Sequence, residues 1–191
     1  EHLYTWEVRN QPRVDAFGNV MPANSYSPDA NLTDSVWHSI RLKNTTAFPW
    51  TSAPALVVSG ERPVAQETLP YTPKSASSEV RITVATDIRA SHQERETARQ
   101  RDVSHRRGYS YDLVSVEGRL TVRNYKTEAV QLSIGETLRG KVVSQSDQGK
   151  TVELAEGIES DNPNSRLTWK IILKPGEERV VTYRYNIWVR G

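Results

Sequence analysis

The chain has no cysteine. This absence excludes disulfides, thiolate nucleophiles and every cysteine-based zinc or iron–sulfur site. A protein without cysteine suits a reducing or an oxidising compartment equally well, so the absence does not indicate a location. The chain also has no apolar run near the ~18 residues of a membrane-spanning helix, and we therefore expect no membrane span.

An excess of charge of one sign is also missing. The chain has 25 basic and 23 acidic residues and a net charge of +2, which gives no electrostatic reason to expect binding to nucleic acid or to a membrane surface. Apolar residues make up 36% of the chain, against roughly 45–50% in ordinary soluble domains. We therefore expect a thin core, as in β-sandwiches whose strands turn one face to water.

The motifs of common catalytic and metal sites are absent as well. The sequence has no Gly-x-Ser-x-Gly nucleophile elbow, no glycine-rich phosphate loop and no Asp-x-Asp-x-Asp-Gly calcium loop. Its four histidines, His2, His38, His92 and His105, form no His-x-His or His-x-x-x-His pair. We therefore predict a non-enzymatic protein with no catalytic residue, no metal and no cofactor.

The sequence does contain alternation with a period of two, which predicts strands. In the last part of the chain Leu167, Trp169 and Ile171 fall on one side of such a strand. Pro175-Gly176 predicts a tight turn before a second alternating strand, which we expect to form a hairpin with the first. The same alternation appears at residues 36–43, 80–88, 109–122 and 181–187. The pattern predicts an all-β protein.

We divide the chain into two β-sandwich-like units, 1–95 and 108–191, joined by a charged connector at 96–107. The first unit contains a long polar loop at 10–35, which several prolines interrupt. Arginine and acidic residues dominate 89–107, a composition compatible with a short helix, a solvated connector or an exposed ribbon. The acids between the arginines argue against a site for an anionic polymer.

The two halves contain similar segments. IRLKNTT at 40–46 and LTVRNYK at 120–126 share an alternating strand that ends in Asn and a turn. A proline turn and a long alternating strand follow later in each half, at 73–88 and 175–189. Two sandwiches of similar build would give this pattern. Chance would also give it, because a strand followed by Asn and a turn is a common combination.

Three strings near the C-terminus carry a resemblance: RLTVRNYK at 119–126, LTWKIILKPG at 167–176 and YRY at 183–185. In this combination the chain resembles the C-terminal region of the mucoidy inhibitor A-like proteins, a bacterial family of unknown function. The earlier strings IRLKN, APA and YTPK are similar to the β region that precedes it, so the resemblance covers about residues 36–191.

The resemblance implies β-sandwich architecture with an immunoglobulin-like C-terminal unit. It carries over no catalytic residue. One stretch, Gly135-Glu136-Thr137-Leu138, departs from the Asp-x-x-Pro step that the family usually has after its Asn turn.

Two further features are candidates for a ligand or catalytic site. We expect His38 to be a packed or hydrogen-bonded histidine rather than a metal ligand or a base, because it shares a strand face with Val36, Ile40 and Leu42. The acidic stretch 153–161 could supply carboxylates to Ca²⁺, but we favour a solvated loop.

The tryptophans offer the best candidate for a binding surface. Burying a tryptophan is worth about 2–3 kcal/mol, so we expect most of the five to lie in the core. Trp37 shares its strand face with polar residues that include Arg41, and Trp50 lies in a proline-flanked corner. We therefore predict a binding surface at Trp37, Trp50 and Arg41.

Together these features predict a non-enzymatic binding or structural module of a larger bacterial, envelope-associated protein. A polar, β-rich composition with five Trp and eight Tyr favours an extracytoplasmic location, periplasmic or secreted. The partner would be a protein. In the alternative it would be a polysaccharide stacked on the exposed tryptophans, as in a carbohydrate-binding module. A hydrolase is a third possibility and would need convergent acids or a His–Asp pair in a cleft.

Overall fold

The structure is a computed structural model that describes residues 1–8, 14–15, 17–20, 35–106, 108–154 and 160–191. This part of the chain forms strands and no helix, which confirms the all-β prediction, and it accordingly has no helix that could cross a membrane. Most of the loop predicted at 10–35 lies outside the described residues. The strands are β1 His2–Val8, β2 Trp37–Lys43, β3 Ala53–Ser59, β4 Arg62–Leu69, β5 Ser77–Val84, β6 Ile88–Arg106, β7 Tyr109–Asn124, β8 Val130–Arg139, β9 Lys141–Gln145, β10 Lys150–Glu153, β11 Asn164–Leu173 and β12 Glu178–Arg190.

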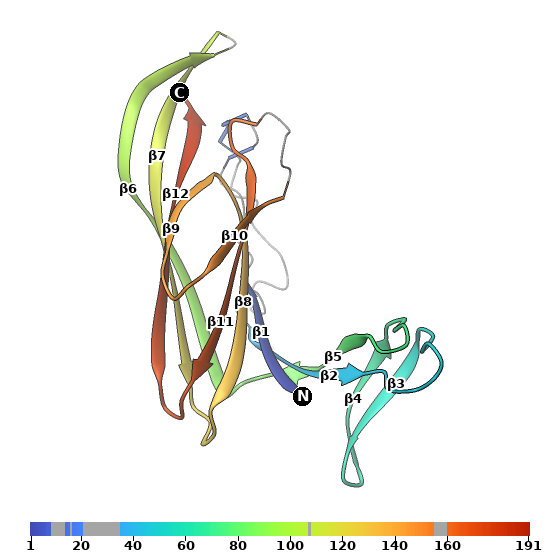
Figure 1. Cartoon of the computed structure of the whole chain (residues 1–191). Helices are drawn as coiled ribbons and strands as arrows, with labels where there is room; N and C mark the ends of the chain where they lie inside the picture. Colours follow the sequence, from blue (N-terminus) through green and yellow to red (C-terminus); the bar gives the residue numbers. More distant parts are fainter. Residues whose placement is uncertain (9–13, 16, 21–34, 107, 155–159) are drawn as a thin grey trace.

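Two sheets face each other and form a sandwich (Figure 1). One has six strands in the order β10-β11-β8-β1-β2-β5, and the other has four in the order β6-β7-β12-β9. Neighbouring strands run antiparallel except for β1 and β8, which pair in parallel. The N-terminal strands β1 and β2 therefore share a sheet with the C-terminal strands β8, β10 and β11.

The core lies between the two sheets, and the period of two decides which residues enter it. On β8 every second residue from Val130 to Leu138 is buried, and on β11 Leu167, Trp169 and Ile171 are buried while Ile172, the residue after Ile171, is 64% exposed. Full burial of a large apolar side chain is worth about 1.5–3 kcal/mol. The alternation predicted in the last part of the chain thus fills the core.

The predicted hairpin across Pro175-Gly176 was wrong in its pairing. β11 pairs with β8 over ten positions and β12 pairs with β7 over thirteen, so the two strands belong to different sheets. The turn between them crosses from one layer of the sandwich to the other. The long registers with β8 and β7 satisfy more backbone hydrogen-bonding groups than a short hairpin would.

The sequence predicts a connector at 96–107, but residues 96–106 form the distal part of strand β6. β6 pairs with β7 along almost its whole length, and the two strands extend beyond the sandwich as an exposed ribbon (Figure 1). The ribbon was one of the alternatives compatible with the composition. Charged side chains suit it because residues 95–103 of β6 are exposed on both faces.

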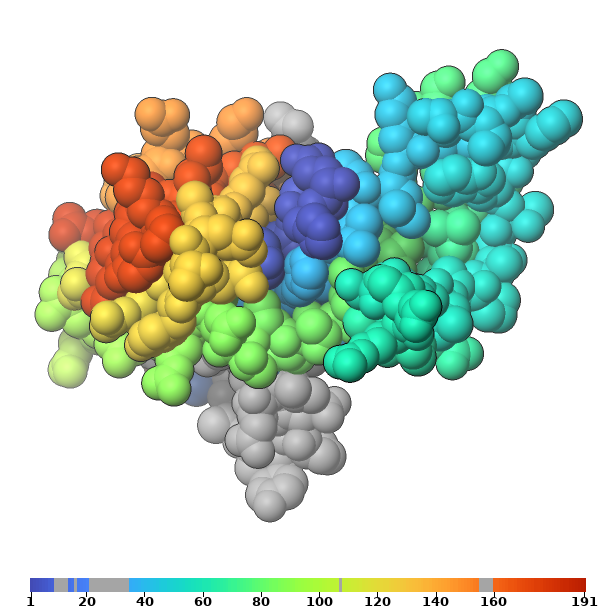
Figure 2. Space-filling model, turned by 90° about the horizontal axis from the view of Figure 1, so that it is seen from below, coloured from blue at the N-terminus to red at the C-terminus, as the bar shows by residue number. Residues whose placement is uncertain are grey.

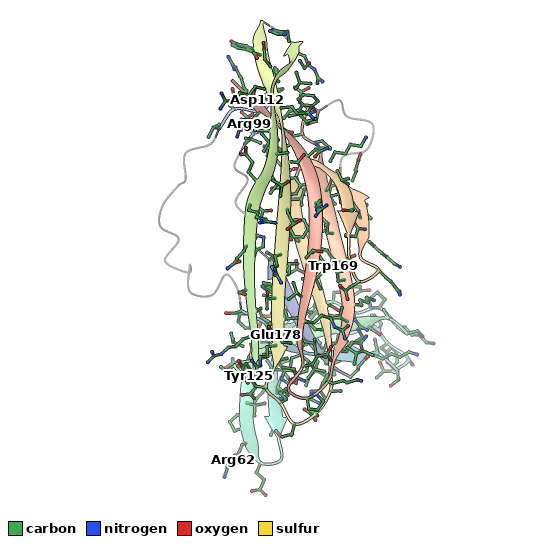
Figure 3. The ribbon with its side chains drawn as sticks, turned by 90° about the vertical axis from the view of Figure 1, so that its left-hand side faces the viewer. Arg62, Arg99, Asp112, Tyr125, Trp169 and Glu178 are labelled. Carbon is green, nitrogen blue, oxygen red and sulfur yellow. The ribbon has the colours of Figure 1, made fainter. Side chains whose placement is uncertain are left out.

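A second projection leaves the other end of the molecule. β2 and β5 run out from the six-stranded sheet, and β3 and β4 form a separate two-stranded sheet beyond them. We call residues 44–76 the arm. Figure 2 shows it as a lobe beside the sandwich, and in Figure 3 Arg62 at its tip lies at the opposite end of the molecule from Arg99 and Asp112 on the ribbon.

The similar segments of the two halves form the same local structure. Asn124 is fully buried, and its side-chain amide donates hydrogen bonds to the carbonyls of Glu128, Leu173 and Lys174 at 2.9–3.2 Å. Its side-chain oxygen accepts one from the backbone N–H of Lys126. One carboxamide thereby joins the turn after β7 to the turn before β12.

Asn44 makes the matching set of contacts in the arm. It is also fully buried, and its amide donates to the carbonyls of Phe48, Thr72 and Pro73 at 2.9–3.3 Å. Its side-chain oxygen accepts a hydrogen bond from the N–H of Thr46. In both places one pair of strands lies inside another along the sequence. The outer pair is β2·β5 or β7·β12, and the inner pair, formed by the chain between them, is β3·β4 or β8·β11. Residues 36–85 therefore repeat the strand plan of residues 109–190.

Replacing Asn124 by alanine should lower the free energy of unfolding by about 2–3 kcal/mol, because it leaves buried carbonyls without their donor. Chemical denaturation followed by tryptophan fluorescence measures this. Asn44→Ala is the matched variant, and it should speed amide hydrogen exchange in the arm with a smaller effect on global unfolding. Equal global losses for the two variants would contradict the view that the arm contributes little to the main core.

Candidate functional site

The three residues predicted to form a binding surface lie along β2 and just beyond it. Trp37 begins β2, and the Arg81 guanidinium carbon lies 5.3 Å from its ring centroid. Trp50 forms an isolated bridge with Thr72 in the arm. The two tryptophans are half-buried and are separated by the length of β2, about 20 Å at the usual rise per residue. They are not adjacent rings of one platform.

Arg41 is engaged within the chain. Its guanidinium donates to the carboxylate of Glu79 at 2.7 Å and lies 3.5 Å from that of Glu1. The hydrogen bond to Glu79 raises the pKa of Arg41 above its ordinary value. A ligand at Arg41 would therefore compete with two carboxylates.

The arm presents an apolar surface that the sequence reasoning did not single out. Leu56 is 62% exposed, Val58 50% and Val64 46%. The register pairs Leu56 with Gln66 and Val58 with Pro63, and a bulge places Val64 beside them, so the three side chains share one face of the β3–β4 hairpin. We call it the arm face. The opposite face is half-buried, and β4 on that side contacts β5.

A polar cluster occupies the inner side of the sandwich at the β6 edge. Glu136 follows the buried alternation of β8 and is fully buried. Tyr183 of β12 points at it from the opposite sheet, and its hydroxyl donates a short hydrogen bond to Glu136 Oε1. His92 and Glu94, two residues apart on β6, complete the cluster, and both are partly buried.

Gly118 allows these side chains to meet. It lies on β7 between Glu94 of β6 and Tyr183 of β12 in one cross-strand row. A Cβ at Gly118 would overlap the ring of Tyr183. Because glycine has no side chain, the tyrosine ring lies across β7 and its hydroxyl reaches β6.

The distances within the cluster are those of hydrogen bonds and ion pairs. The Tyr183 hydroxyl lies 2.9 Å from His92 Nε2 and 2.9 Å from Glu94 Oε1, and His92 Nε2 is 3.7 Å from Glu136 Oε1. Burial, reinforced by the charges of Glu136 and Glu94, raises the pKa of the Tyr183 hydroxyl far above its ordinary value. Tyr183 therefore stays protonated and acts as a donor. The cluster can hold a proton or a cation between two carboxylates.

Sequence reasoning missed this cluster because its members come from three strands up to 91 residues apart. Two local signals were present. Glu136 is a carboxylate at an inward position of an otherwise apolar strand, and His92 and Glu94 have the i, i+2 spacing that places both on one face.

His38 lies in a shallow groove with His2 and Tyr4. Its Nε2 is 2.8 Å from His2 Nδ1, and its ring stacks on Tyr4 with centroids 4.9 Å apart. Lys126 and Glu128 also line the groove. Among the described residues His38 hydrogen-bonds to His2 and to no carboxylate. Burial lowers the pKa of His38, and the nearby charges of His2 and Lys126 lower it further.

The acidic stretch 153–161 is only partly described. Residues 155–159 lie outside the described residues. At its end the carboxylate of Asp161 pairs with the guanidinium of Arg106.

A scan against models of known protein families, a search of curated proteins and a search of solved structures each found no match to this chain.

Gly118→Ala should destabilise the protein by about 1–3 kcal/mol, the usual range for inserting a methyl group into a well-packed site. Thermal unfolding followed by circular dichroism measures the loss. Gly191→Ala is the control, because its added Cβ would meet neighbours only at 3.8 Å or beyond. If Gly118→Ala unfolded like the parent chain, the close packing of Tyr183 on Gly118 would be disproved.

The His2–His38 pair should make stability depend on pH. Because the pKa of His38 is lower in the folded state than its ordinary value of 6.5, its contribution is complete above that value. It is lost as the pH falls through the folded-state pKa. His38→Gln should flatten the slope of unfolding free energy against pH below 6.5, measured by urea denaturation. An unchanged slope in the His38→Gln variant would contradict the prediction.

Proposed function

We propose that this chain is a non-enzymatic protein-binding module of a larger bacterial, envelope-associated protein, and that the arm face is its binding surface. The observation that carries the proposal is an apolar β face that no described residue covers. An isolated two-stranded hairpin is marginally stable in water, and contiguous exposed apolar residues are typical of interaction sites.

The repeated strand plan supports this assignment of the face. Val130, six residues after Asn124, pairs with Leu173, and Trp50, six residues after Asn44, bridges to Thr72. Continuing the count aligns Leu56 and Val58 of the arm with positions 136 and 138 of β8, which are buried in the core. The arm face thus corresponds to the face that the C-terminal unit packs against its second sheet. The β3–β4 hairpin is therefore equivalent to one layer of that sandwich.

The occupant that suits this face is the apolar β surface of another protein. Sheets pack face to face through interdigitating aliphatic side chains, and Leu56, Val58 and Val64 are aliphatic. They offer no ring on which a sugar could stack and no charge for a phosphate. Burying the part of the three side chains that is still exposed would yield about 2–5 kcal/mol, which the loss of free motion on association largely offsets. Tight binding therefore needs further contacts, and Phe48 and Tyr71 near the base of the arm, 74% and 59% exposed, can supply them.

The carbohydrate-binding alternative has less support. A stacking platform requires neighbouring aromatic rings, whereas Trp37 begins β2 and Trp50 lies beyond the other end of that strand, in the arm. The resemblance to the mucoidy inhibitor A-like proteins is the basis for proposing a bacterial protein, and the polar, β-rich composition with five Trp and eight Tyr is the basis for proposing an envelope context. The nested pairs β7·β12 and β8·β11, in facing sheets, support an immunoglobulin-like C-terminal unit.

Photocrosslinking tests the proposal. A diazirine amino acid at position 56 should form a discrete crosslink to a protein when the whole protein is expressed in its host. The same group at position 172 is the control, because Ile172 is equally exposed but lies on the outer face of β11. Adding Val58→Asp should abolish the crosslink from position 56 by placing a charge in the contact. Equal crosslinking from both positions, or none from position 56, would refute the arm face as the binding surface.

A further inference from the structure

The polar cluster brings ligand atoms from both sheets to one point. His92 Nε2 and carboxylate oxygens of Glu94 and Glu136 all lie within 4.8 Å of one another. Glu136 is fully buried, whereas the side chain of His92 is 13% exposed. The inner end of the cluster is therefore dry, and its outer end can be reached from solvent at the β6 edge.

The spacing is close to that of a coordination shell. Metal–nitrogen and metal–oxygen bonds of about 2.0–2.2 Å place neighbouring ligand atoms roughly 3–3.6 Å apart. His92 Nε2 and Glu136 Oε1 are 3.7 Å apart. The two β6 ligands need only side-chain rotations to close the remaining distances, because they share one face of an edge strand.

The charges of the cluster also suit a cation. Two carboxylates and an imidazole nitrogen surround one phenol, and the single hydroxyl proton of Tyr183 can be donated to one acceptor at a time. A cation between Glu94 and Glu136 would be attracted by both carboxylates, and Tyr183 would remain as the hydrogen-bond donor that orients Glu136.

We propose that His92, Glu94 and Glu136 form a binding site for one divalent transition-metal ion, with Zn²⁺ as the best match. An imidazole nitrogen with two carboxylates is typical of zinc and its first-row neighbours, whereas Ca²⁺ and Mg²⁺ prefer sites made of oxygen alone. Three protein ligands leave a fourth position for water. The site is separate from the arm face and does not rest on the proposed function.

Metal binding would tie the edge strand β6 to β8 in the opposite sheet. It would do so within the sandwich, just before the stretch of β6 that is exposed on both faces. The expected consequence is a more rigid attachment of β6 to the sandwich.

Titration calorimetry of the EDTA-treated full chain with Zn²⁺ tests the site. We expect one ion per chain. Glu136→Gln and His92→Gln should each weaken the affinity at least about tenfold, and Zn²⁺ should slow hydrogen exchange around residues 90–96 in the parent chain only. Co²⁺ gives a second readout, since its visible absorption in a protein site should disappear in both variants.

The controls separate this site from other histidines. His38→Gln removes the His2–His38 pair, and His105→Gln removes the histidine beside Asp102 on the ribbon. Both should keep one bound ion. Far-UV circular dichroism checks that each variant is folded, and if Glu136→Gln unfolds, the His92→Gln variant at the rim decides alone. Absence of Zn²⁺ binding at micromolar concentrations, or loss of binding with His38→Gln rather than His92→Gln, would overturn the proposal.

Discussion

A buried asparagine side chain sets the plan of this molecule twice. Asn124 and Asn44 each hold two chain reversals together by donating to carbonyls on both of them. Such a buried carboxamide has few ways to satisfy its donors and acceptor, so the contact fixes where the outer strands end and begin. In both places the chain between the two reversals forms the inner pair of strands, β8·β11 in the sandwich and β3·β4 in the arm.

The same plan has two different outcomes because the inner strands differ in composition. Strands β8 and β11 place Leu, Ile and Trp at their inward positions, and a second sheet covers them. In the arm the corresponding positions are less apolar, with Pro54 and Gln66 beside Leu56 and Val58, and no second sheet lies over them within the described ranges. The arm is held by hydrogen bonds and by its contact with β5, whereas the sandwich is held by a core. Within the described ranges the arm is therefore a part of the chain whose apolar face has no covering sheet.

The sequence predicted those features that depend on local pattern. Alternation placed Trp169 in the core, and the repeated strand–Asn–turn pointed to Asn44 and Asn124. Pairing could not be read in the same way, because β11 and β12 find their partners in β8 and β7 far along the chain. Residues 96–106 form a strand because β7 offers a template, although their own composition is equally compatible with a connector. The polar cluster was missed for the same reason: it exists only after β6, β8 and β12 are brought together.

The parallel pairing of β1 with β8 has a consequence for synthesis of the chain. β1 leaves the ribosome before β8, and Trp6 reaches its buried position only after β8 and the strands that cover it have been made. More than a hundred residues must emerge before that contact can form, and contacts of such long sequence separation form slowly. During this interval the apolar side of β1 is exposed beside the growing arm. The nascent protein is therefore most open to aggregation, and most in need of a chaperone, before its C-terminal half appears.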